Sequence, residues 1–213
     1  MMASTDEKLF EWLTSLSSFS LPSWEELPDL DLYMDQVVTY LERELSPLIV
    51  EDEEKMITTW MINNYVKGSL LPNSVKKKYS KDHLAYLLAI CSVKQILSIP
   101  NIATLFEFQK EQAVNPEKLY AYFRENQSQT MQDVIHNALK RMEYHSKDID
   151  SNRLYLYEMV FKLAIEAQAK KIVAEKILYL LSKSDDFYKD EIARLTKEQL
   201  ELQKIERERK AKK

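Results

Sequence analysis

The sequence contains a single glycine, Gly68, and six prolines among its 213 residues. Two-residue β-hairpin turns place residues at positive φ, a conformation that glycine adopts without a steric penalty. A chain with one glycine therefore has few positions for the tight turns of a hairpin-rich fold. Hydrophobic residues make up 45% of the chain and charged residues 30%, which is typical of a globular protein. These features predict an all-α fold.

Apolar residues recur at three- and four-residue spacing in several segments without breakers, which indicates amphipathic helices. Asp29 or Asp31 is expected to cap the second helix, and Trp24 to anchor the connector before it by burial. In the fourth helix, residues as far as Ile96 and Leu97 are expected to be mostly buried. We predict helices over residues 5–17, 30–45, 59–67, 81–97, 100–109, 116–126, 130–144 and 151–182.

The longest predicted helix, residues 151–182, is apolar on more than one side. Such a helix is either central in a bundle or half of a dimer interface, and the sequence leaves both possibilities open. Small residues along it allow close approach of a neighbour: Ala164, Ala167, Ala169 and Ala174. The following segment, residues 184–213, is charged, and its apolar residues span too few heptads to predict a coiled coil.

Residues 58–79 combine a short helix, a breaker and a basic strip. Thr58 or Thr59 can cap the helix, and we expect it to end at Gly68 in the left-handed conformation. Between Val66 and Lys81 the chain has five lysines and no acidic residue, although its formal net charge is −4. A basic strip on an acidic protein indicates local binding of an anionic partner such as DNA.

Residues 61–72, Met-Ile-Asn-Asn-Tyr-Val-Lys-Gly-Ser-Leu-Leu-Pro, resemble the recognition-helix signature of the MerR regulators, T-I-R-Y-Y-E-x-x-G-L-L-P. The similarity continues through Tyr79 and residues 82–84 to residues 94–102. Residues 24–107 also resemble an uncharacterised bacterial domain family of unknown function, found mainly in Gram-positive Firmicutes. The identical positions in the recognition-helix signature are Ile62, Tyr65, Leu70, Leu71 and Pro72.

The MerR resemblance implies a winged helix-turn-helix domain over residues 27–110, preceded by a helix and connector at 1–26. A helical domain or dimerisation region at 111–183 and a charged C-terminal helix or tail at 184–213 would follow. The implied function is that of a cytoplasmic, homodimeric DNA-binding transcriptional regulator. The expected contacts with double-stranded DNA come from Thr58, Thr59, Asn63, Asn64, Lys67, Lys76, Lys77, Lys78 and Tyr79.

Departures from the MerR pattern leave a second function open. Asn63 replaces the arginine that contacts DNA, Asn64 replaces the next tyrosine, and the segment from Pro72 to Tyr79 lacks the Gly-Tyr-Arg of the wing. A helical protein–protein interaction module that keeps the fold without binding DNA would tolerate these changes.

Other residue patterns do not indicate an enzyme, a metal site or a cofactor. The three histidines are scattered, and no paired-Cys, His-Glu-x-x-His or P-loop motif occurs. Cys91 is expected to be a buried small apolar residue. Aromatic residues at 120, 122, 123, 155 and 157 are expected in the core, with a small-molecule pocket as the alternative. No apolar run is long enough to predict a membrane span.

Overall fold

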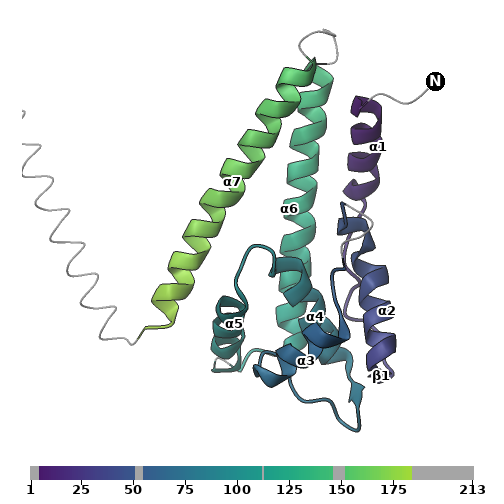
Figure 1. Ribbon diagram of the computed structural model, residues 1–213, viewed down its shortest axis with the longest axis vertical. Coiled ribbons are helices and arrows are strands. Elements are labelled where there is room, and N and C mark those ends of the chain that lie inside the picture. The colour runs from purple at the N-terminus through teal and green to yellow at the C-terminus, as the bar shows by residue number, and fades with distance from the viewer. Residues whose placement is uncertain (1–4, 51–54, 112, 146–151, 184–213) are drawn as a thin grey trace, which may run out of the picture. The chain divides into compact units, whose positions relative to one another are not determined.

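The computed structural model describes residues 5–50, 55–111, 113–145 and 152–183 (Figure 1). The predicted charged segment at 184–213 lies outside these residues. The described part is mostly helical, as predicted, with one small two-stranded sheet. Its elements are α1 (Thr5–Ser17), β1 (Leu32–Tyr33), α2 (Met34–Leu45), a 3-10 helix (Ser46–Leu48), α3 (Thr59–Lys67), β2 (Lys78–Tyr79), α4 (Lys81–Val93), α5 (Ile99–Glu111), α6 (Pro116–His145) and α7 (Asn152–Leu181).

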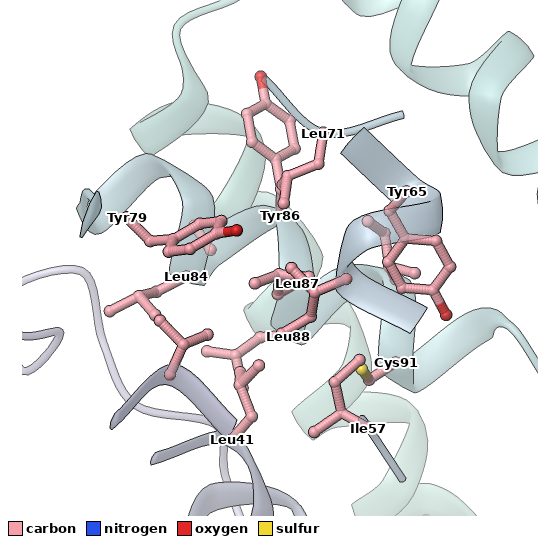
Figure 2. Close-up of a cluster of buried hydrophobic side chains, with 14 of the residues drawn as sticks. Leu41, Ile57, Tyr65, Leu71, Tyr79, Leu84, Tyr86, Leu87, Leu88 and Cys91 are labelled. Atoms are coloured by element: carbon pink, nitrogen blue, oxygen red, sulfur yellow. The ribbon is translucent and has the colours of Figure 1, made fainter. Parts of the chain in front are cut away.

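The chain divides into two units after Gln168, and α7 runs from the first unit into the second. In the first unit, α4 lies at the centre of the larger hydrophobic core. Its sequence is almost continuously apolar from Leu84 to Cys91, and a helix that is apolar on all sides is stable only when neighbours cover each side. Helices α2 and α6 and strand β2 contact α4. Figure 2 shows the buried side chains that meet there, including Leu41 of α2, Tyr65 of α3 and Leu84 of α4.

The start of α2 differs from the prediction. The helix begins at Met34 instead of Leu30, and its N-cap is Tyr33, whose backbone N–H donates to Oε1 of Gln36 at 2.9 Å. The prediction that Asp29 or Asp31 caps this helix is therefore wrong. Residues 32–33 form a strand before the helix starts, so Asp29 and Asp31 lie too far from its first turn. The Asp29 carboxylate instead accepts a 2.7 Å hydrogen bond from Nζ of Lys81.

Helix α3 has its predicted bounds, but its C-terminus forms differently. Thr58 is the N-cap, and its hydroxyl accepts from the Met61 N–H at 3.2 Å. Gly68 has φ −82°, so the expected left-handed glycine is wrong. The left-handed residue is Ser69, with φ 58°, and the N–H of Leu70 then donates to the Tyr65 carbonyl at 2.9 Å. The reversal that ends the helix therefore falls one residue later than predicted.

Helix α6 is continuous, whereas the sequence suggested separate helices at 116–126 and 130–144. The residues in between, Gln127, Ser128 and Gln129, are polar but contain no helix breaker, so the backbone hydrogen bonds continue through them. Another difference concerns α4, which ends at Val93. Ile96 consequently lies beyond the helix and is exposed instead of buried.

A second hydrophobic cluster joins α1, the C-terminal half of α6 and the start of α7. Leu13 and Leu16 of α1 contribute to it, together with Tyr155 and Met159 of α7. Helix α1 therefore packs on α6. Most other apolar side chains of α7 are exposed, so within the described chain this helix is not the centre of a bundle.

We expect Leu84→Ala to lower the free energy of unfolding by about 2–5 kcal/mol, because it removes a side chain with no solvent exposure from the first turn of α4. Urea denaturation followed by circular dichroism measures the change. Leu30→Ala removes the same atoms from a residue that is 80% exposed and should change stability by less than about 0.5 kcal/mol. Equal effects of the two substitutions would contradict the central position of α4.

Candidate nucleic-acid interface

A short hairpin at residues 75–79, here called the basic hairpin, follows α3. The N–H of Val75 donates to the Lys78 carbonyl at 3.0 Å, and the N–H of Lys78 donates back to Val75 at 2.9 Å. Strand β2 of this hairpin pairs antiparallel with β1, with Leu32 opposite Tyr79. The hairpin is thereby fixed to the segment that leads into α2. It lies at the same end of the first unit as α3 (Figure 1).

The two residues at the tip of the basic hairpin, Lys76 and Lys77, have φ of 52° and 64°. Positive φ at both central residues is the pattern of a type I′ turn, for which Asn-Gly is the favoured sequence. An L-residue in the left-handed region costs roughly 1–2 kcal/mol. The chain thus holds two exposed lysines in an unfavourable backbone conformation, and such strain is often found at functional sites.

One side of α3 is exposed and polar, while the other side belongs to the core. Ile62 and Tyr65 are buried. Thr59, Asn63 and Lys67 follow at four-residue spacing, so they lie on the same face of the helix, and all three are exposed. The structure therefore places three of the predicted contact residues on one face of α3, and two more, Lys76 and Lys77, at the tip of the hairpin.

The remaining predicted contact residues are less accessible. Thr58 is half-buried and its hydroxyl caps α3, while Asn64 is also half-buried. The ammonium of Lys78 lies 5.1 Å from the ring centroid of Tyr33. Tyr79 is only 4% exposed, and its ring packs edge-on against His83 at 5.4 Å. The expectation that Tyr79 grips a phosphate is corrected, because its side chain supports the hairpin from the core.

Trp60 is a surface residue that is not among the contacts predicted from the sequence. Its side chain is 70% exposed on α3. It precedes Asn63 by three residues and Lys67 by seven, which places it beside them on the helix surface. The signal was available in the sequence, since Trp60 falls outside the spacing that puts Ile62 and Tyr65 in the core.

Lysines supply the positive charge on this surface. Lys81, at the start of α4, is held by protein groups, because it pairs with Asp29 and its ammonium lies 5.5 Å from the Trp24 ring centroid. The exposed lysines are Lys67, Lys76 and Lys77, and the exposed Asp31 lies next to β1, which pairs with β2. Lysines arranged in this way can neutralise phosphates, and the amide of Asn63 can donate to and accept from a base edge.

Other kinds of site find no support in the described residues. No group of three or more His, Cys, Asp or Glu side chains there could hold a metal ion. None of the helices in the described ranges combines the length and apolar character needed to cross a membrane. Cys91 is buried, as predicted, and this burial raises the pKa of its thiol to about 11.

Comparison with known proteins gives a family match for the part of the chain that contains the candidate interface. Residues 22–123 match the model of a family described as Domain of unknown function (DUF1836). This region begins before β1, contains the basic hairpin and ends in α6. No curated protein matches the chain, and no solved structure does.

Cys91 should react slowly with Ellman's reagent in the folded protein at pH 8. A thiol pKa of about 11 leaves roughly 100-fold less thiolate than an exposed cysteine has, and burial blocks access as well. The chain has one cysteine, so the absorbance change reports Cys91 alone. Unfolding in guanidinium provides the fast reference rate, and the same rate in folded and unfolded protein would show that Cys91 is not buried.

Proposed function

We propose that this protein is a DNA-binding transcriptional regulator that contacts double-stranded DNA through the exposed face of α3 and the basic hairpin. In this proposal the first unit contains a MerR-like winged helix-turn-helix domain. Helix α2 is its first helix, α3 its recognition helix and the basic hairpin its wing. The observation that carries the proposal is the pair of strained, exposed lysines at the hairpin tip, at the same end of the unit as α3 (Figure 1).

The end of α3 adds support for the MerR register. In the gap-free alignment of residues 61–72, the glycine of the MerR pattern falls on Ser69. Ser69 is the residue that adopts φ 58° in this structure. A position that requires the left-handed conformation is one where glycine is the usual residue. The backbone therefore turns at the place where the pattern calls for glycine, although this chain carries serine there.

Phosphate contacts and base contacts would come from different residues of α3 and the basic hairpin. Lysines 67, 76 and 77 would hold the phosphate backbone and supply affinity that does not depend on sequence. Asn63, with Thr59 beside it, would read base edges in the major groove. Few cations take part and the chain is acidic overall, so a single copy would bind weakly. Two copies on a near-palindromic site would bind more tightly.

A homodimer through α7 fits this requirement, and a second copy is the partner that we propose for its exposed apolar side. Tyr155 and Met159 face the cluster with α1 and α6. Leu154, Tyr157, Phe161 and Ile165 recur at three- and four-residue spacing on the opposite side, each more than 60% exposed. Further exposed apolar residues follow along the same helix in the second unit: Ile172, Val173, Ile177, Tyr179 and Leu181.

The exposed apolar patch on this side of α7 is large for a monomer. At roughly 150–250 Å² for a large side chain, Leu154, Tyr157, Phe161 and Ile165 together present about 500 Å². A monomer rarely exposes a patch of more than a few hundred Å². A standard protein interface buries about 800 Å² on each partner.

A protein–protein interaction module remains the alternative, and Trp60 is the observation that favours it. An exposed tryptophan is the residue type most enriched at interaction hot spots. Binding through Trp60 would respond little to salt, because apolar contacts are not screened. DNA binding through lysines would weaken steeply as salt rises. The two functions thus differ in a directly measurable property.

Replacing the hairpin tip by Lys76→Asn/Lys77→Gly should weaken DNA binding and stabilise the fold. We expect an affinity about tenfold lower for every duplex, and a plot of log K against log salt that is shallower by about two, because two phosphate contacts are lost. The free energy of unfolding should rise by about 1 kcal/mol, since Asn-Gly suits the turn. Fluorescence anisotropy between 50 and 200 mM salt, on duplexes selected from a random pool, measures binding.

Lys110→Ala/Lys118→Ala is the matched control, because it removes the same charge from exposed positions on α5 and α6. This variant should bind DNA with the wild-type salt dependence. Absence of wild-type binding at 50 mM salt would refute DNA binding. An unchanged salt dependence in the hairpin variant would show that the basic hairpin makes no phosphate contact.

Wild-type protein should sediment as a dimer, at about twice the chain mass of 25.2 kDa. Phe161→Glu/Ile165→Glu should convert it to monomer, because two carboxylates would be buried at the interface without partners. Analytical ultracentrifugation at tens of micromolar measures the mass. Leu30→Glu, at an exposed residue outside α7, should leave the dimer intact. A monomeric wild type would refute the proposed role of α7.

A further inference from the structure

A cavity of about 230 Å³ lies in the first unit between α4, α5 and the first turns of α6. Its inner wall contains residues of the main core, among them Ala85, Phe106 and Tyr120, which are all buried. Leu105 and Tyr122 also line it and are exposed, so the cavity opens to the surface between α5 and α6.

The polar ends of two lining tyrosines are used by other protein groups. The hydroxyl of Tyr86 donates to Oε1 of Gln109 at 3.0 Å, and Nε2 of Gln109 donates to the Val114 carbonyl at 2.7 Å. The hydroxyl of Tyr120 donates to the Pro22 carbonyl at 2.9 Å. Both hydroxyl groups therefore already donate to protein acceptors, and the lining of the cavity is apolar. A water molecule needs two to four polar partners, which such a lining does not offer.

We propose that this cavity binds a neutral, apolar small molecule of about the size of two fused aromatic rings. An apolar cavity of about 150 Å³ accommodates benzene, and this one is larger by roughly the volume of a second ring. Aromatic side chains form much of the wall, and Tyr86 and Phe106 already meet edge-to-face, with ring centroids 5.0 Å apart. Such a wall favours an aromatic ligand, whereas a charged ligand would lose its hydration without compensation.

The proposal does not depend on DNA binding, because the cavity and the basic hairpin use different residues. It also accounts for the aromatic residues at the start of α6. Tyr122 is too exposed for a core residue, whereas the edge of a ligand pocket explains its position. Tyr120 forms part of the inner wall. Binding can be measured without nucleic acid, so this proposal and the proposed regulator function succeed or fail separately.

Titration of the full chain with 1-aminonaphthalene, which is neutral at pH 7, tests the proposal. Its fluorescence should rise and saturate at one probe per chain, with a Kd on the order of 10–100 µM. Ala89→Phe places a ring in the cavity and should raise the Kd at least about tenfold. Ala121→Phe adds the same ring to an exposed α6 position outside the cavity and should bind the probe like wild type.

Leu105→Glu is a second variant that does not depend on the core accepting a larger residue. Leu105 is exposed at the mouth of the cavity, so the protein should fold, while a carboxylate there should also weaken probe binding about tenfold. Circular dichroism confirms the folding of each variant. Wild-type protein without a saturable signal would overturn the proposal. Unchanged binding in folded Ala89→Phe and Leu105→Glu proteins would overturn it too, because the probe would then bind elsewhere.

Discussion

The burial of α4 on every side is the constraint on which the rest of the first unit depends. Exposure of its apolar side chains to water would be unfavourable. Packing of α2, α6 and β2 against α4 buries them. The same helix supports the basic hairpin through Tyr79 and His83 and lines the apolar cavity through Ala85 and Tyr86. The two proposed sites therefore share one rigid element, although they have no residue in common.

The basic hairpin shows how a polar site is built on this core. Pairing with β1 and the burial of Tyr79 fix its base, so the tip can hold Lys76 and Lys77 at positive φ despite the conformational cost. A flexible lysine loop would avoid that cost but would not fix the backbone from which both lysines project. Two lysines on a fixed backbone, at the same end of the unit as α3, are the physical basis of the proposed regulator function, because they can contact a phosphate backbone.

Two regions of the described chain expose apolar surface, and we propose a different binding partner for each. On α7 it forms a stripe of Leu154, Tyr157, Phe161 and Ile165 opposite Tyr155 and Met159, a convex surface suited to another helix. Between α5 and α6 it surrounds a concave space with aromatic walls, suited to a small molecule. Shape, more than hydrophobicity, separates a proposed partner surface from a proposed ligand site.

The sequence by itself determined the helical architecture, the bounds of α1 and α3 and the burial of Cys91, because scarce glycine, apolar spacing and helix caps act locally. It also identified the basic strip of Lys67, Lys76, Lys77, Lys78 and Lys81. Only the tertiary structure decided that Tyr79 turns into the core and that Ser69 instead of Gly68 adopts the left-handed conformation. The sequence raised a small-molecule pocket at residues 120, 122 and 123 only as an alternative, because the walls of the cavity come from helices whose packing depends on contacts between residues far apart in the chain.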